Sequence, residues 1–395
     1  MSGQVLRDGL RDRDPQLDAS REIETDLQRA TWRSGRFYLL SQIRLADIGY
    51  DEVFFVPTSD HGGGLTVTVD APQKLYYAPT KKVIFSATVA PGYSFFEKAD
   101  RSGQFNIHGR ADAHFLFNHL YLDVFGSVAD VLASQTTEIN RLTTIKQSEV
   151  GVAGELKYSS RTSMLFRTSY EQLEHPLDRF QPEDVPVELL DRDARNVRVS
   201  LRHKTFPLTS TFIFGERSNY GFRYATYKDG HRDYAGAGAD WNNGRSRLRV
   251  EAGAAQLVFE DPQYEPFQGI LGSVDWNRTT RRWNFNGLLR RDLQFSILEN
   301  QNYLVVHRGG LLGEFSATPR LRLRVGTSLE RTNYDRPDVN GQKRQDDISF
   351  NYGGFRWTRR HFMAGLDVGW YERTSTTFGD DESGIRTIVH LSFTP

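Results

Sequence analysis

Apolar and polar residues alternate along this chain from about residue 82 to its end, with no helical pattern between the alternating stretches. A period of two residues is that of a β-strand with one polar and one apolar face. In the last stretch, residues 384–395, one face would carry Ile385, Thr387, Val389, Leu391 and Phe393. The other face would carry Arg386, His390 and Ser392. A whole chain of such strands predicts an all-β fold, a closed antiparallel barrel.

About eighteen stretches follow this pattern, and they are near the length that a tilted strand needs to cross a bilayer. Their expected spans are 37–56, 63–79, 81–96, 104–118, 119–132, 145–159, 162–175, 192–206, 208–222, 233–244, 247–260, 269–280, 282–296, 303–317, 320–334, 346–358, 361–374 and 384–395.

Short and long connections alternate between these stretches. The connections at 159–162, Pro207 and Pro319 are short, whereas those at 132–144 and 175–192 are long and rich in turn-forming and charged residues. Short periplasmic turns and longer extracellular loops are typical of outer-membrane barrels. An even strand number would place both chain ends on the periplasmic side.

The size of the barrel decides which face meets water. A ring of about eight strands can fill its interior with side chains, but a ring of sixteen to eighteen leaves an open lumen. An apolar interior would then be an empty cavity, so we expect the polar face to line the lumen and the apolar face to meet lipid. The predicted pore-lining residues are Arg198, Arg202, Lys204, Arg249, Glu251, Arg290, Asp292, Arg308, Glu314, Arg322, Arg324, Glu330, Asp367 and Tyr371. Most of these opposite charges are expected to pair across neighbouring strands.

Aromatic residues are expected to form girdles at the two membrane interfaces. Trp283, Phe285 and Phe295 lie near the two ends of one predicted apolar face. Arg291 and His307 interrupt the apolar faces of their strands. Because an arginine at mid-bilayer costs about 2–4 kcal/mol, we expect neither residue to lie at that depth.

Composition narrows the function further. The 395 residues are 38% hydrophobic, which is low for a protein with a large dry core, and the 50 basic and 50 acidic side chains give no nucleic-acid footprint. There is no cysteine, and no motif for a cofactor, a metal or catalysis is found. The first 30 residues lack the apolar middle of a signal peptide. Export would therefore require a signal outside the numbered chain, and a cytosolic β-protein is the alternative.

Residues 1–35 form a charged segment before the predicted barrel of residues 36–395. Ser20 is a good N-cap residue, with Glu22 and Glu24 in the first turn after it. Two interpretations stay open for this segment, a short periplasmic helix near 20–31 and a disordered leader.

Two resemblances bear on function. The alternate residues Val389, Leu391 and Phe393 resemble the C-terminal signal read by the bacterial outer-membrane insertion machinery, although Thr394 and Pro395 follow the aromatic. The stretches 35–96, including KVIFSATVAPGYSFF at 82–96, and HLYLDVFGSVADV at 119–131 resemble outer-membrane barrels of the β-barrel porin 2 type. Members of that group accompany exopolysaccharide synthesis and export. The resemblance implies passage of a polysaccharide or other polar solute, with periplasmic export proteins and outer-membrane lipid as partners.

Three functions follow from these observations. Polysaccharide export without catalysis is the main expectation, and a general or solute-specific diffusion porin is the alternative. The third is a lipid-modifying barrel enzyme, in which His307 would act as a base beside a serine on a neighbouring strand.

Overall fold

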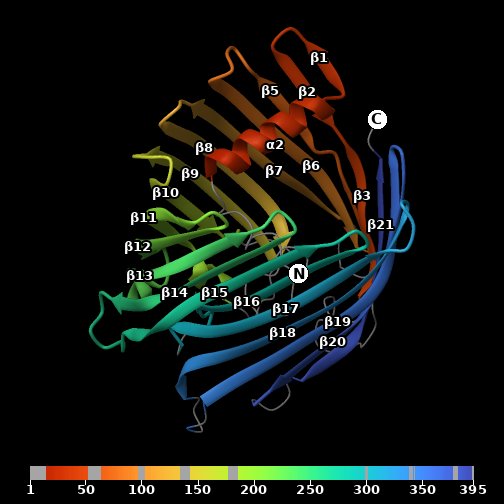
Figure 1. The fold of residues 1–395 in the computed structure, drawn as a ribbon. Coiled ribbons are helices and arrows are strands. Elements are labelled where there is room, and N and C mark those ends of the chain that lie inside the picture. The colour runs from red at the N-terminus through yellow and green to blue at the C-terminus, as the bar shows by residue number, and fades with distance from the viewer. Residues whose placement is uncertain are drawn as a thin grey trace.

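The chain forms a single ring of antiparallel strands that closes on itself, and the helix α2 lies inside it (Figure 1). The computed structural model describes residues 15–51, 64–96, 103–133, 143–176, 186–298, 301–337, 341, 343–376 and 381–393. The first elements are α2 (Pro15–Arg29), β1 (Trp32–Ser34), β2 (Phe37–Ser41), β3 (Ile43–Asp51), β4 (Gly64–Asp70), β5 (Gln73–Tyr77), β6 (Val83–Phe96), β7 (Gln104–Leu116), β8 (Leu120–Ala133), β9 (Thr143–Lys157) and β10 (Thr162–Glu174). The others are η1 (Val187–Leu190), β11 (Arg192–Phe206), β12 (Thr209–Phe222), η2 (Thr226–Lys228), β13 (Gly230–Asn242), β14 (Ser246–Phe259), β15 (Phe267–Thr279), β16 (Trp283–Phe295), β17 (Tyr303–Ser316), β18 (Leu321–Pro337), β19 (Lys343–Arg359), β20 (Phe362–Ser375) and β21 (Glu382–Phe393).

The ring has eighteen strands, as the alternation predicts. Gln42 alone separates β2 from β3, and Ala71 and Pro72 separate β4 from β5, so each pair is one strand of the ring. The ladder continues across both breaks, because the amide of Gln42 donates to the carbonyl of Pro72 at 3.1 Å. Strand β21 closes the ring by pairing with β3 from Phe393↔Ile43 onward. The short β1 pairs with β2 beyond the point where β21 ends.

Each predicted stretch coincides with one strand of the ring, and the alternation of connections is also confirmed. Strands β11 and β12 are joined by two residues, whereas β10 and β11 are joined by a long connection that contains η1. Both ends of the ring, at Phe37 and Phe393, lie on the side of the short connections. Residues 52–56 of the first predicted stretch lie outside the described residues.

The outer wall is apolar and the inner wall is polar. On β11, Val197, Val199 and Leu201 are 45–49% exposed, while Arg202 on the opposite face is only 9% exposed. An exposed aliphatic face on a closed ring matches the hydrocarbon of a bilayer, where closure satisfies every strand's backbone groups. Among the described residues, no helix combines the length and apolar character needed to cross a bilayer.

Outward aromatic rings gather at the end of the barrel that carries the short connections. Trp283 stacks on Phe285 at 5.4 Å and contacts Phe315 at 4.7 Å between ring centroids. Farther around the ring, Phe37 stacks on Tyr77 at 4.7 Å. These contacts form the girdle expected at the periplasmic interface.

The expected placement of Phe295 is wrong. The pairing of β15 with β16 ends at Gly272↔Arg291, while β16 stays paired with β17 as far as Phe295↔Tyr303. The free end of this hairpin turns into the ring, where Phe295 contacts Tyr220 and Phe222 of β12 at 4.9 and 4.8 Å. Phe295 therefore packs inside the barrel and does not belong to a girdle.

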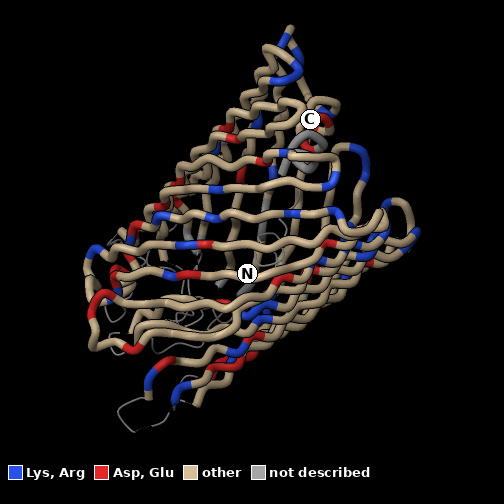
Figure 2. The backbone as a smooth tube through the Cα atoms, turned by 60° about the vertical axis from the view of Figure 1, so that its left-hand side comes forward, with Lys and Arg blue, Asp and Glu red and all other residues tan. Residues whose placement is uncertain are grey.

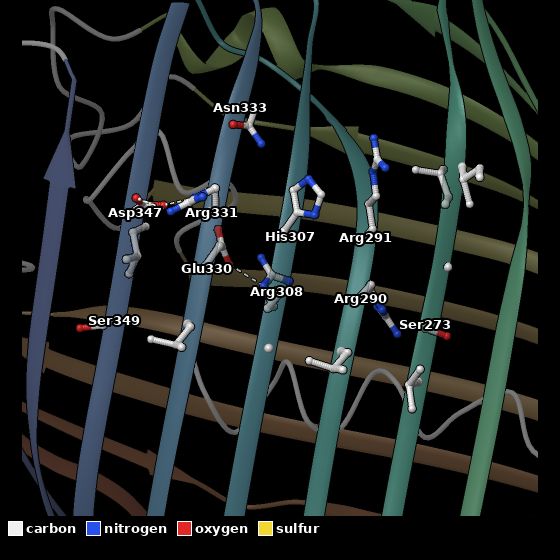
Figure 3. A pocket seen from close by; sticks show the side chains of 18 of the residues that line it. Ser273, Arg290, Arg291, His307, Arg308, Glu330, Arg331, Asn333, Asp347 and Ser349 are labelled. Carbon is white, nitrogen blue, oxygen red and sulfur yellow. Dashed lines mark hydrogen bonds and ion pairs between the residues drawn. The ribbon is translucent and has the colours of Figure 1, made fainter.

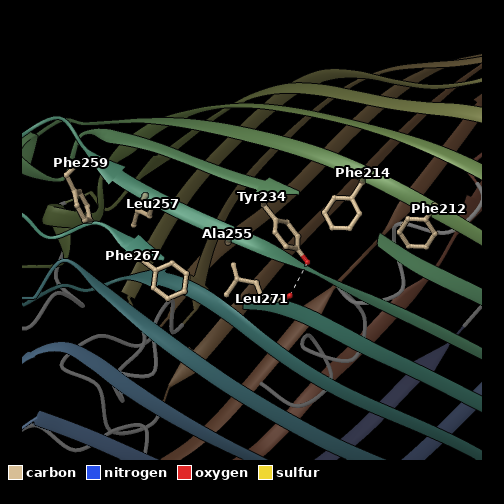
Figure 4. Packing of buried hydrophobic residues seen from close by; sticks show 8 residues of the cluster. All are labelled: Phe212, Phe214, Tyr234, Ala255, Leu257, Phe259, Phe267 and Leu271. Atoms are coloured by element: carbon tan, nitrogen blue, oxygen red, sulfur yellow. Dashed lines mark hydrogen bonds between the residues drawn. The ribbon is translucent and has the colours of Figure 1, made fainter. Parts of the chain in front are cut away.

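A cluster of buried apolar side chains lies beside this inward hairpin end, on the inner wall of β12–β15 (Figure 4). Leu293, Phe295, Tyr303 and Val305 of β16 and β17 pack against it. The cluster consists of Phe212, Phe214, Tyr234, Ala255, Leu257, Phe259, Phe267 and Leu271. Part of the inner wall is therefore dry, although charged and polar side chains line other parts of it.

The N-terminal segment contains a helix, α2, which begins at residue 15, earlier than the expected position near 20. It lies across the inner wall of the first strands (Figure 1). Ile23, only 5% exposed, packs against Tyr76 and Ile84, and Leu27 one turn later packs on the same cluster. Lys74 of β5 pairs with Glu22 and Asp26 of the helix at 2.8 Å each.

Candidate channel site

The inner wall of β11–β14 carries a connected set of ion pairs. Arg198 of β11 reaches Glu216 of β12 at 3.0 Å and Glu251 of β14 at 2.8 Å. Arg232 of β13 also contacts Glu216 at 2.6 Å, so this carboxylate is shared by two guanidinium groups. Each partner points inward because its position has the same parity as the polar face of its strand.

A second set lies nearer the short connections. Asp240 of β13 accepts a hydrogen bond from Arg202 at 3.0 Å and one from Arg249 at 3.5 Å. Arg249 also donates to Glu251 at 3.2 Å, which joins the two sets. The pairing predicted for these strands is thus present, and it extends over strands that are not direct neighbours.

Aromatic rings support these guanidinium groups from beneath. The guanidinium of Arg198 lies 4.4 Å from the ring centroid of Phe214, and that of Arg249 lies 4.9 Å from Phe212. Both rings belong to the apolar cluster shown in Figure 4. A planar cation held between a ring and a carboxylate has little rotational freedom, so its remaining donors keep a fixed direction.

Further pairs lie on β17–β20. Arg308 of β17 pairs with Glu330 of β18. Arg324 of β18 lies between Glu314 at 3.2 Å and Asp367 at 2.6 Å. His390 of β21 also contacts Asp367 at 3.1 Å. Asp292 lies 3.9 Å from Arg232, and Tyr371 lies on the inner face of β20 opposite Phe350.

Some predicted cations have no ion-pair partner among the described residues. Arg322 of β18 lies directly opposite Arg356 of β19, with no carboxylate paired to either. Arg290 of β16 lies directly opposite Arg308, whose own partner is Glu330. Lys204 is exposed near the short turn after β11. Like charges that face each other across a ladder repel, so these positions favour an anion from solution.

Basic residues outnumber acidic ones on the inner face from β11 to β21, and charged positions recur along these strands (Figure 2). The basic set is Arg192, Arg198, Arg202, Lys204, Arg232, Arg247, Arg249, Arg290, Arg308, Arg322, Arg324, Arg344, Arg356, Arg373 and Arg386. The acidic set is Glu216, Asp240, Glu251, Asp275, Asp292, Glu314, Glu330, Asp346, Asp367 and Glu382.

The sequence analysis missed two cations of the inner face, Arg356 and Arg232, and one buried cation in a connection, Lys228. Arg356 has the parity of the polar face in the stretch 346–358, so the alternation alone would have placed it on the inner wall. Arg232 falls just before the predicted start of its strand at 233. Lys228 lies in a connection, and it is fully buried where its ammonium donates to the carbonyl of Ser296 at 2.6 Å. No sequence pattern indicates such a contact between two connections.

Polar contacts also tie the long-connection end together. His175 is 3% exposed and its ring lies 2.7 Å from a carboxylate oxygen of Asp191. Arg223, which follows β12, donates to Glu174 at 2.8 Å, and this hydrogen bond raises the pKa of the Arg223 guanidinium. These contacts hold the rim of the barrel in one arrangement.

One group of the inner wall has the composition of a metal site. Single ligand atoms of Asp112, His114 and Asp123 lie within 4.8 Å of one another. Arg110 already contacts Asp112 at 2.6 Å, and the His114 ring lies 3.0 Å from Asp123. The group is therefore engaged in its own hydrogen-bonded network, and the expectation of no metal stays a prediction.

The direct neighbours of His307 do not supply the serine that the enzyme alternative requires. Its direct neighbours across the ladder are Arg291 on β16 and Arg331 on β18, and neither is a serine. A histidine flanked by two cations lacks both the nucleophile and the carboxylate that would orient it. His307 and Arg291 lie in the halves of their strands that are nearer the long connections, and their position away from mid-bilayer stays a prediction.

Known structures share the fold of this chain. No protein-family model matches the sequence, and no curated protein matches it either. Among solved structures, Acinetobacter baumannii OccAB2 aligns with a TM-score of 0.54 at 10% identity, covering 92% of this chain and 99% of that one. Pseudomonas aeruginosa OpdK, solved with vanillate, aligns with a TM-score of 0.53 at 9% identity, covering 90% and 98%. OccAB4 of Acinetobacter baumannii aligns with a TM-score of 0.52 at 11% identity, covering 92% and 99%.

These likenesses establish the fold, which is that of a bacterial outer-membrane porin barrel and agrees with the expected location. They do not support the finer resemblance to exopolysaccharide-export barrels.

Proposed function

We propose that this chain is a diffusion channel of the bacterial outer membrane for a small polar solute, and that it favours an anionic, carboxylate-bearing one. The observation that carries the proposal is the excess of basic residues on the inner face of β11–β21. Within it, Arg322 and Arg356 face each other without an ion-pair partner among the described residues. This reading corresponds to the alternative derived from the sequence.

The geometry suggests how such a solute would move. A guanidinium offers two parallel donors to a carboxylate, and several lie at successive heights of the wall. Conduction requires binding that is favourable at entry yet weak enough for release. Arginines already paired with Glu216, Glu251 or Asp367 would bind a passing anion weakly, whereas Arg322 and Arg356 would attract it at the short-connection mouth. OpdK, a structural neighbour, was solved with a carboxylate compound, vanillate.

Polysaccharide export, the main expectation from the sequence, finds no support in the structural comparisons. The insertion-signal residues Val389, Leu391 and Phe393 occupy alternate positions of β21, on the outward face. Their recognition by insertion machinery, like the periplasmic partners, stays a prediction.

Reversal potentials across a planar bilayer test the proposal. We expect the wild-type channel to conduct chloride and small carboxylates in preference to potassium. The double variant Arg322→Gln with Arg356→Gln should lose at least half of that preference, because it removes the unpaired charge. The matched control Arg217→Gln removes a cation from the outer wall and should leave selectivity unchanged.

Two results would contradict the proposal. One is a wild-type channel that prefers cations. The other is a current blocked by neutral oligosaccharides but insensitive to carboxylates, which would restore the export reading.

A further inference from the structure

Three basic side chains form a row across the outer wall, on the face that meets lipid. Arg291 of β16, His307 of β17 and Arg331 of β18 are direct partners in the ladder. All three are exposed, and Figure 3 shows them side by side at one height. Neighbouring positive charges on adjacent strands destabilise a sheet unless an anion lies beside them.

The structure compensates this row only at one end. Arg331 makes two hydrogen bonds to Asp347 of β19, at 2.7 and 3.0 Å. Glu372 lies farther along, on β20 opposite Ser349. Arg291 has no carboxylate partner in the part of the chain that the structure describes. The positive potential is therefore strongest around Arg291, and the ring of the neighbouring His307 can add a hydrogen bond there.

A groove of about 1230 Å³ on the outer wall includes the row itself at its polar end, and its other end is apolar. Small residues, Ala252, Gly272 and Gly309, form its floor, and Leu289 and Leu329 lie along it. A second groove of about 680 Å³ continues on β16–β21 toward the short connections, lined by Leu311, Val325 and Val368 among others. The cations thus lie near the long connections, and the apolar parts of the two grooves lie nearer the short connections. This order matches a lipid with an anionic head and acyl chains.

We propose that this surface binds a phosphate-bearing lipid of the outer leaflet. The phosphate would lie between Arg291 and His307, and the acyl chains would follow the grooves. A guanidinium fork matches the oxygens of a phosphate, and its hydrogen bonds are stronger at the dry edge of a bilayer than in water. The inference rests on the membrane placement in the proposed function but concerns the outer wall, not the lumen.

Native mass spectrometry of the full chain in a neutral detergent tests this site. Diphosphorylated lipid A is the probe, and the same lipid stripped of its phosphates is the comparison. We expect one lipid A to remain bound per barrel and the dephosphorylated form to dissociate. The double variant Arg291→Gln with His307→Gln should bind at least about tenfold more weakly, as expected for the loss of charge-assisted hydrogen bonds.

The controls separate this site from general attraction to the membrane. Arg217→Gln removes an outward arginine of β12 that is already 3.7 Å from Asp233, and it should keep full affinity. Arg291→Lys retains the charge without the fork and should show an intermediate loss. Excess inorganic phosphate should not displace the lipid, because it cannot occupy the groove.

Several outcomes would overturn the proposal. Equal retention of the dephosphorylated lipid, unchanged binding by the double variant, or displacement by inorganic phosphate would each do so. An oligomer that forms without lipid and dissociates in the double variant would also overturn it. The face would then be an interface between two copies of the chain. Channel conductance should be unaffected by the double variant, so the failure of this site and the failure of the proposed function are distinguishable.

Discussion

The two sectors of the inner wall differ in charge and in what covers them. On β3–β10, acidic residues such as Asp112, Asp123 and Glu149 roughly match the basic ones, and α2 covers the part near β5 and β6. On β11–β21, basic residues exceed acidic ones, and the apolar cluster and the inward end of β16–β17 pack on the wall. The same antiparallel ladder runs through both sectors, so the difference arises from inner-face side chains, from α2 and from the inward end of β16–β17.

This contrast indicates a division of roles within one barrel. The balanced sector provides a surface on which a helix can dock, because Tyr76 and Ile84 offer an apolar contact and Lys74 offers a charge for Glu22 and Asp26. The basic sector retains donors that the protein does not fully use, and these are available to a solute. A barrel can therefore be narrowed on one side and selective on the other without a change in its backbone.

Detachment of α2 from the inner wall should have the largest effect on conductance. It tests whether the helix narrows the channel in the balanced sector, the inner face of β3–β10. Ile23→Asp would place a carboxylate among Tyr76 and Ile84, at a position that is 5% exposed. Burial of an unpaired charge costs more than about 3 kcal/mol, so the helix should leave the wall. We expect protease sensitivity within residues 15–29 and a larger single-channel conductance.

The exposed variant Glu24→Ala serves as its control and should change neither property. Unchanged conductance with an accessible helix would show that α2 does not narrow the channel.

Charges placed on the outer wall should cost the same in both sectors, because lipid surrounds the whole ring. Val150→Arg on β9 and Leu329→Arg on β18 replace outward residues that are 56% and 60% exposed and lie away from the aromatic girdle. Each should lower the free energy of unfolding by about 2–4 kcal/mol. Urea titration of the barrel folded into vesicles measures this loss. A difference of more than about 2 kcal/mol between the two variants would break the assumption of a uniform outer wall.

The smallest expected difference is between two arginines that face each other at the border of the sectors. Arg167 of β10 lies opposite Arg198 of β11. Arg167 pairs with Glu149 alone and is 43% exposed in its side chain, whereas Arg198 pairs with two carboxylates and is 18% exposed. We expect Arg198→Leu to cost about 2 kcal/mol and Arg167→Leu less than about 1 kcal/mol.

The same vesicle titration resolves these values, and Arg198→Leu should also weaken anion preference. Equal costs for both variants would mean that the network of the basic sector adds nothing to a single pair.

The sequence by itself determined the eighteen strands, the alternation of connections and the polar or apolar character of each face. These properties are local, because the side-chain period of a strand follows from backbone geometry and a wide ring cannot fill its interior. Tertiary structure alone decided which charges meet, such as Arg198 with Glu251 across two intervening strands. It also decided that α2 docks inside and that Phe295 leaves the outer wall. Register, closure and the inward bend of a hairpin depend on residues far apart in the chain, and a period of two carries no information about them.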